Sequence, residues 1–287
     1  MKHLACALGL AWLAPLPVHA QTPSATIVGV GFVGSEAARY DERRDEYLVS
    51  NRGPSSAPDQ SFVSRVSPDG NVIELKWIEH GRNGVTLLDP LGIFLHGDLL
   101  YVADIAAVRL FDRSSGAPHG SVEIPGAVRL NDLAVARDGT VYVSDSGADG
   151  VAGAIYKISP QRRVTAFVAR DPALERVNGI AVMPDGNIVH GGRGVNLVFR
   201  SPKGAVLREQ TLPTGRIDGI VAMADGGLLV ASQDGHGVYH VPRGKEPMLV
   251  ARDIPIPAAI GLDTKRARLL VPQIQAGSLT FVELPRP

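Results

Sequence analysis

The sequence is almost free of cysteine, because its one thiol, Cys6, lies close to the N-terminus. An internal disulfide is therefore excluded, and the fold must rest on an apolar core. An excess of charge is also missing, since 29 Lys and Arg residues balance 29 Asp and Glu residues and neither sign forms a long block. This balance argues against a nucleic-acid partner.

Several patterns that mark common enzyme folds are absent as well. Residues 21–287 show no amphipathic helical period of useful length, which argues against a TIM barrel and a doubly wound sheet. No Gly-x-Ser-x-Gly elbow and no Gly-x-x-x-x-Gly-Lys loop occur. We therefore expect neither an α/β serine hydrolase nor a P-loop nucleotide-binding protein.

The N-terminus has the features of a secretory signal peptide. Lys2 and His3 precede an apolar run over residues 4–16, and small residues lie three and one positions before Gln21. The run is shorter than the roughly 20 apolar residues of a membrane-spanning helix, and it contains Pro15. We predict a signal peptide over residues 1–20, a mature domain over 21–287 without an integral membrane segment, and a periplasmic or secreted location.

A repeat is the main feature of the remaining chain. Each unit has a small polar start, a short apolar strand, a turn and a second apolar strand, and successive units start 40 to 55 residues apart. The units cover residues 36–50, 91–104, 131–145, 178–191, 218–232 and 258–272. Asp-Gly pairs in three of the turns favour the positive φ of tight hairpins. Two more strands follow in most units, so the repeat predicts an all-β fold, a six-bladed β-propeller.

The two ends of the chain are expected to close the ring together. After Pro272 one clear strand remains, over residues 278–284, so the last unit lacks its outer strand. The β-rich run at 25–32 has no partner in the first blade. We predict that this N-terminal run completes the sixth blade and removes an exposed sheet edge.

The first residue of each unit carries the strongest sign of chemistry. Alignment on the second strands places six residues at one position, and four of them are oxygen donors: Glu36, Asn131, Asn178 and Asp218, against Leu91 and Ala258. Asn and Asp before Gly are also common in turns. However, the innermost strands of a propeller line its channel, so four equivalent donors should converge there. An all-oxygen set with two carboxylates indicates a divalent cation, above all Ca²⁺, with Mg²⁺, Mn²⁺ or Zn²⁺ as alternatives.

The loops that follow the second strands should open on the same face as this cation. They carry candidate substrate contacts at Asp145, Arg193 and His236, although loops are polar in any protein. His236 is the one histidine that we consider as a general base. His190 lies on a second strand and is expected to be a packing residue.

The residues also resemble a known family. The segments EAARYD at 36–41, RLND at 129–132, NGIA at 178–181 and DGI at 218–220 are similar, in order, to those of the senescence marker protein (regucalcin), gluconolactonase and luciferin-regenerating enzyme family. The resemblance implies a six-bladed propeller with a divalent metal on Glu36, Asn131, Asn178 and Asp218. It also implies proton transfer by Asp218 and a substrate contact by Arg129. The chain departs from family lactonases at Ala37 and Ala38, where Gly-Pro or Ser-Pro is common.

Three functions are compatible with these observations. The first is a metal-dependent hydrolase of a lactone or related ester, acting on a small-molecule substrate. The second is a non-catalytic propeller that binds a ligand or protein and uses the metal as a structural pin. The third, on weaker grounds, is a propeller similar to strictosidine synthase. Four protein oxygens leave coordination positions free on Ca²⁺, which favours the enzyme.

Overall fold

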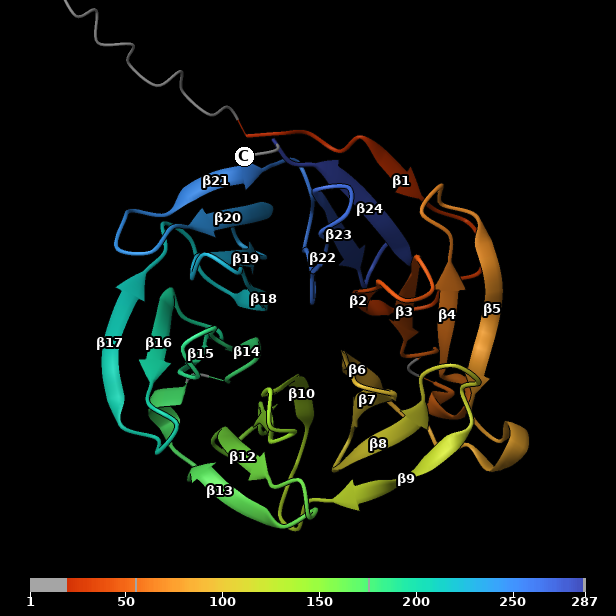
Figure 1. Ribbon diagram of the computed structural model, residues 1–287, viewed down its shortest axis with the longest axis horizontal. Coiled ribbons are helices and arrows are strands. Elements are labelled where there is room, and N and C mark those ends of the chain that lie inside the picture. The colour runs from red at the N-terminus through yellow and green to blue at the C-terminus, as the bar shows by residue number, and fades with distance from the viewer. Residues whose placement is uncertain (1–19, 55, 175, 286–287) are drawn as a thin grey trace, which may run out of the picture.

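The computed structural model describes residues 20–54, 56–174 and 176–285, and these form a six-bladed β-propeller. Six antiparallel sheets of four strands stand around a central channel, and the chain passes through them in order (Figure 1). The predicted fold class is confirmed. The predicted signal peptide lies, apart from Ala20, outside the described residues. Among the described residues, no helix is long and apolar enough to cross a membrane.

The strands of each blade run from the channel outward. Blade 1 has β2 (Ser35–Asp41), β3 (Glu46–Asn51), β4 (Phe62–Val66) and β5 (Val72–Glu79). Blade 2 has β6 (Pro90–His96), β7 (Leu99–Asp104), β8 (Ala107–Asp112) and β9 (Pro118–Glu123). Blade 3 has β10 (Leu130–Val135), β11 (Val141–Asp145), β12 (Ala154–Ile158) and β13 (Val164–Val168).

The second half of the ring repeats this plan. Blade 4 has β14 (Ile180–Val182), β15 (Ile188–His190), β16 (Asn196–Arg200) and β17 (Val206–Thr211). Blade 5 has β18 (Ile217–Ala222), β19 (Leu228–Ser232), β20 (Gly237–Val241) and β21 (Met248–Ala251). Blade 6 has β22 (Gly261–Asp263), β23 (Arg268–Gln273), β24 (Ser278–Glu283) and, from the N-terminus, β1 (Ala25–Ile27). The described part of the chain also contains three short 3₁₀ turns, at Pro58–Gln60, Arg82–Gly84 and Pro172–Leu174.

The apolar core lies between blades rather than at the centre of the ring. Each hydrophobic cluster of the described residues draws mainly on two neighbouring blades, as Val189 of blade 4 and Val230 of blade 5 illustrate. The second strands β3, β11 and β19 are buried along their whole length, because both of their faces meet another blade. The outer strands β9 and β17 are largely exposed. This division leaves the channel free for polar side chains.

The Asp-Gly turns form hairpins as the sequence predicts. Gly139, Gly186 and Gly226 have φ of 85°, 85° and 84°, a conformation that costs glycine little. The aspartate before each glycine accepts a hydrogen bond from the backbone two residues ahead, for example Thr140 N to Asp138 Oδ1 at 3.0 Å. The turns thus fix the register of the strand pairs that position the channel residues.

The ring closes between the two ends of the chain, also as predicted. Figure 1 shows β1 along the outer side of β24. The paired residues are Ala25–Phe281, Thr26–Thr280 and Ile27–Leu279. The Ser24 hydroxyl donates to Phe281 O at 3.1 Å. The closing strand is shorter than the predicted run of 25–32, because Gly29 and Gly31 adopt φ of 71° and 96° and end the extended backbone.

Candidate metal centre and pocket

The four predicted ligands occupy equivalent places in their blades. In β2, β10 and β18 the regular pairing with the second strand is interrupted between Ser35 and Ala38, between Leu130 and Leu133, and between Ile217 and Ile220. Each interruption contains a predicted ligand: Glu36, Asn131 or Asp218. Asn178 lies just before β14, and its N–H donates to Gly191 O at 2.8 Å. Such irregularities turn a side chain away from the regular sheet direction.

The glycines that follow the ligands serve close packing at the axis rather than a turn. A Cβ atom on Gly179 would lie 1.8 Å from Asp218 O, and one on Gly219 would lie 2.3 Å from Ile260 N. The described residues with a positive φ include neither Gly179 nor Gly219. The innermost strands therefore touch here, and only glycine fits. The reading of Asn-Gly and Asp-Gly as turn residues is thereby corrected at these two positions.

Three buried oxygens of the predicted ligands have no hydrogen-bond partner among the described residues. They are Glu36 Oε2, Asn178 Oδ1 and Asp218 Oδ1. Glu36 is 4% exposed and Asp218 is 1% exposed, so water does not substitute freely. Unsatisfied buried oxygens are costly unless a ligand satisfies them. A hard cation that prefers oxygen donors fits this set.

Neighbouring residues hold other polar atoms of Asn131, Asn178 and Asp218. Asp218 Oδ2 accepts from Asn178 Nδ2 at 3.1 Å and from Gln233 Nε2 at 2.6 Å. Asn131 Nδ2 donates to Ser146 Oγ at 2.9 Å. These bonds orient the side-chain amides of Asn131 and Asn178. Each Nδ2 atom donates to a protein group, and each Oδ1 atom remains for a cation. A divalent cation would thus be held by Glu36, Asn131, Asn178 and Asp218.

The electrostatics of the two carboxylates agree with this assignment. Burial raises the pKa of Glu36 from 4.5 to about 7, although Arg52 and Arg129 oppose the shift. Burial, and then the charge of Glu36, raise the pKa of Asp218 well above its ordinary value. Each group thus disfavours ionisation of the other. A cation between them would reverse this effect.

A second pair of charges lies deeper in the channel and was missed by the sequence analysis. Arg39 Nη2 lies 3.3 Å from Asp132 Oδ1, and Asp132 is fully buried. Arg39 Nη1 donates to three backbone carbonyls, including Ile260 O at 2.7 Å. Because Arg39 balances Asp132, the ionised channel keeps two uncompensated negative charges, on Glu36 and Asp218. A divalent cation would neutralise them.

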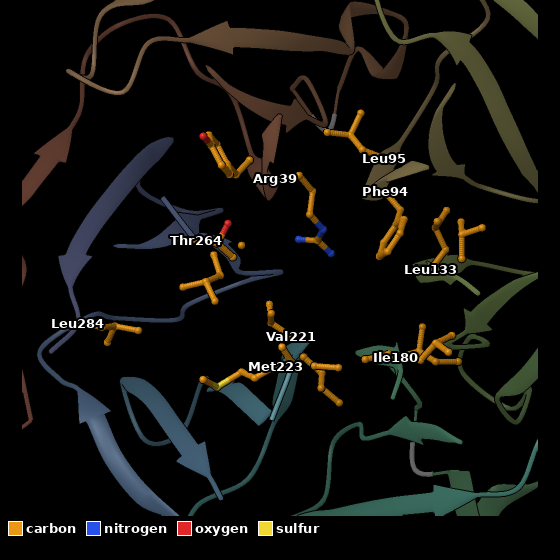
Figure 2. Close-up of a pocket in the computed structure, with 18 of the residues that line it drawn as sticks. Arg39, Phe94, Leu95, Leu133, Ile180, Val221, Met223, Thr264 and Leu284 are labelled. Carbon is orange, nitrogen blue, oxygen red and sulfur yellow. The ribbon is translucent and has the colours of Figure 1, made fainter. Parts of the chain in front are cut away.

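Beyond Arg39 the channel becomes apolar. A cavity of about 520 Å³ opens toward the hairpin turns of the innermost strands. Figure 2 shows the Arg39 guanidinium in its middle, with Phe94, Leu133, Ile180 and Val221 around it. The Arg39–Asp132 pair therefore separates a polar half of the channel from an apolar half.

The polar half opens into a pocket of about 290 Å³ on the opposite face. Two predicted ligands and two predicted substrate contacts line it: Asn131, Asn178, Arg129 and Arg193. Its other lining residues are Ser146, Arg176, Gly192, Arg216, Ile217 and Gln233. Arg176 and Arg216 were not predicted, since nothing in their local sequence distinguishes them from other loop arginines.

Asp145, a predicted substrate contact, has a different place. It is fully buried, and its carboxylate accepts from Val128 N at 2.9 Å, Arg129 N at 2.8 Å and Arg170 Nη2 at 2.7 Å. It therefore holds the loop that carries Arg129 instead of lining the pocket. Asp104 has the same role in blade 2, where its carboxylate accepts from Leu88 N and Asp89 N.

The two histidines are not brought together with the ligands. His236 is exposed, has a φ of 47°, and is not among the described residues that line the pocket. His190 is 3% exposed and accepts from Arg200 Nε at 2.9 Å. Burial, and then Arg200, lower the pKa of His190 to about 3, so it stays neutral, as expected of a packing residue.

Comparison with known proteins places the fold beside lactonases, lyases and regucalcin. No family model and no curated protein matches the chain. A gluconolactonase from Xanthomonas campestris has a TM-score of 0.70 and 18% identity, covering 94% of this chain and 99% of its own. Virginiamycin B lyase from Staphylococcus aureus has a TM-score of 0.65, 14% identity, and coverages of 91% and 99%. A calcium-binding regucalcin from Agrobacterium tumefaciens has a TM-score of 0.64 and 16% identity, covering 92% of this chain and 94% of its own.

These neighbours include the gluconolactonase and regucalcin propellers that the sequence resembles. At such low identity the likeness concerns the fold. Any inference about the chemistry of this protein must therefore rest on its own residues.

Cation binding is expected to strengthen as the pH rises through about 7, the pKa of Glu36. Below this pKa a cation must displace the proton of the Glu36 carboxyl. The affinity for the cation should therefore rise by up to about tenfold per pH unit for each proton displaced. In the absence of a cation, the raised pKa also means that the folded state loses stability as the pH rises from about 4.5 to about 7, because Glu36 must lose its proton at a buried site. Added cation should thus raise the melting temperature more at about pH 8 than at about pH 5.

Glu36→Gln is the control, because it removes the titrating group of this pair that has its pKa near 7. The variant should show a smaller dependence of cation binding on pH than the wild type. Equal cation-induced stabilisation of the wild type at both pH values would contradict this account.

Proposed function

We propose that the protein is a divalent-metal-dependent hydrolase of a lactone or related ester, with the metal in the central channel. The observation that supports this most is the set of buried, unpartnered oxygens from blades 1, 4 and 5. Asn178, which carries one of these oxygens, is hydrogen-bonded to Asp218 and lines a pocket together with Asn131. A site of this kind combines a cation with access for a small molecule.

The residues have separate tasks in this proposal. A bound divalent cation would polarise a carbonyl and stabilise negative charge on its oxygen. Asp218 would accept the proton of an attacking water, because its carboxylate belongs to the proposed cation site and a carboxylate can act as a general base. Gln233 and Asn178 hold Asp218 in place through its Oδ2 atom. Arg129 would contact a substrate oxygen at the rim.

The alternative is a structural metal in a protein that binds ligands without turnover. A structural site is closed by protein ligands, whereas a catalytic site keeps a position open to solvent. Asn131 and Asn178 reach the pocket surface, which supports the catalytic alternative. A lyase reaction, the activity named for three of the structural neighbours, is distinguished from hydrolysis by product analysis.

Purified protein is expected to hydrolyse at least one member of a panel of sugar lactones, aliphatic lactones and aryl esters. Addition of a chelator should lower the rate by about a hundredfold or more, since carbonyl activation would be lost. Readdition of Ca²⁺, Mg²⁺, Mn²⁺ or Zn²⁺, one at a time, identifies the ion that restores activity. Hydrolysis that is insensitive to chelator would sink the proposal. Cation binding without turnover of any panel member would favour the structural role.

A further inference from the structure

Arginine dominates the mouth of the polar pocket. Four of its described lining residues are arginines, Arg129, Arg176, Arg193 and Arg216, and none is an aspartate or glutamate. The whole chain has balanced charge, so this concentration is local. A concave site lined by one sign of charge focuses its field on ligands of the opposite sign.

The arginines are not committed to strong partners within the protein. Arg193 has no side-chain hydrogen bond or ion pair among the described residues, and it is exposed. Arg216 lies 3.8 Å from Asp234, with both side chains about half exposed. Arg176 pairs with Asp149, whose side chain is fully exposed. Ion pairs this exposed are weak, so a ligand anion can replace them.

Arg129 completes the set from the other side of the pocket. It lies 3.9 Å from Asp89, but that carboxylate is held by Arg52 at 2.6 Å. Arg129 therefore keeps donors for a ligand. Arg129 lies two residues before the predicted ligand Asn131 and lines the pocket with it, so it suits the reacting end of a substrate.

The backbone presents Arg193 and Arg216 to the same hollow. Arg216 N donates to Arg193 O at 3.0 Å, and Ile217 N donates to Gly192 O at 2.8 Å, so the loops of blades 4 and 5 are tied together. Arg176 and Arg216 both adopt a left-handed backbone, with φ of 56° and 52°. Non-glycine residues rarely adopt this conformation unless their surroundings fix it, so the backbone is held at both residues.

A second hollow of about 290 Å³ adjoins this part of the pocket. Arg176 and Arg193 line both hollows, and Val151 and Pro172 form part of the outer one. The two arginines thus lie between the channel mouth and the outer surface. A ligand with its reacting group over the channel would bring its far end to them.

We propose that the pocket selects an anionic substrate, a lactone or ester whose far end carries a carboxylate or phosphate. Arg193 and Arg216, with Arg176, bind that group through charge-assisted hydrogen bonds. The identity of the reacting group rests on the proposed function, whereas the recognition of the anion does not. A neutral substrate of the same size would leave the arginine charges uncompensated by the ligand.

Equilibrium binding tests this proposal without any need for turnover. Calorimetry of the Mg²⁺-loaded protein would compare gluconate with two ligands that differ from it at the far end alone, one phosphorylated and one oxidised to a second carboxylate. At least one of the two ligands with a charged far end should bind about tenfold or more tightly than gluconate, whose far end is neutral; tenfold is the scale of one hydrogen bond to a charged group. Which of them does so distinguishes phosphate from carboxylate recognition.

Arg193→Gln with Arg216→Gln should abolish this preference, so that the two ligands with a charged far end bind no more tightly than gluconate does to the same variant. Arg193→Lys should retain part of the preference, because it keeps the charge but not the planar donors. Arg137→Gln is the matched control: Arg137 is exposed in the hairpin turn of blade 3, on the opposite face.

Equal affinity of the wild type for all three ligands would overturn the proposal. A preference that survives in the double variant would do the same, because it would place the anion elsewhere. If the preference is found but no lactone or ester is hydrolysed, the inference stands and the proposed hydrolase activity fails.

Discussion

Replacing Asp218 by asparagine is expected to lower turnover at saturating cation by roughly a hundredfold or more, the usual scale for losing a general base. The substitution keeps the size of the side chain but removes its charge and its basicity. Asp218 Oδ2 accepts two amide hydrogens, from Asn178 and Gln233. An amide carbonyl that keeps those bonds turns an NH₂ group toward the place of the cation. Cation affinity should therefore fall as well, so rates must be measured over a wide range of cation concentration.

Glu36→Gln is the matched variant for this experiment. It removes a charge of the same sign from the same site without removing the proposed base, and Glu36 Oε2 is equally unpartnered. It should weaken cation binding but recover much of the turnover once cation is saturating. Equal activity of the wild type and Asp218→Asn at saturating cation would rule out Asp218 as the base.

Arg39→Met is expected to lower the free energy of unfolding by about 3–5 kcal/mol, the range for breaking a buried ion pair. The Arg39 side chain is 14% exposed and Asp132 is fully buried. The substitution would leave the Asp132 charge unpaired and would remove the Arg39 donor from the carbonyls of Ala38, Ala259 and Ile260. Urea or guanidinium unfolding, with the slope checked against the wild type, measures the loss.

The double variant Arg39→Met with Asp132→Asn separates charge from packing. It should recover about half or more of the lost stability, because residue 132 would no longer carry a buried charge without its partner. If the double variant is as unstable as the sum of the two single variants, the ion pair contributes no coupling. In that case the role assigned to it here is wrong.

Repetition explains why the fold could be predicted from this sequence. The six units differ in most residues, but each keeps a turn and two apolar strands in order. The Asp-Gly turns are local, so their effect on φ can be read without knowing the rest of the fold. The equivalence of Glu36, Asn131, Asn178 and Asp218 could be predicted for the same reason, since a blade fixes the position of its first strand.

Residues that act across blades could not be predicted in this way. Arg39 and Asp132 are 93 residues apart, and neither has a local sign of its partner. Asp145 ends a second strand and has the sequence environment of a pocket residue, but it turns back to bind the backbone before β10. Arg176 and Arg216 reach the pocket from loops whose course depends on contacts with neighbouring blades. In each case the role of the residue depends on the direction of its side chain in the folded protein, which local sequence does not determine.

The closure of the ring by β1 has a consequence for how the chain folds. Thr26 and Thr280 meet across 254 residues, whereas the blades are built from contacts within one repeat. The entropy of such a long loop is only about 1.5 kcal/mol less favourable than that of a loop of one repeat, because the penalty grows with the logarithm of length. Its effect is on rate instead, since long-range strand pairing is slow. A nascent chain must keep the edge of β24 unpaired until both ends have arrived, so the last blade to form is also the one most open to pairing with another molecule.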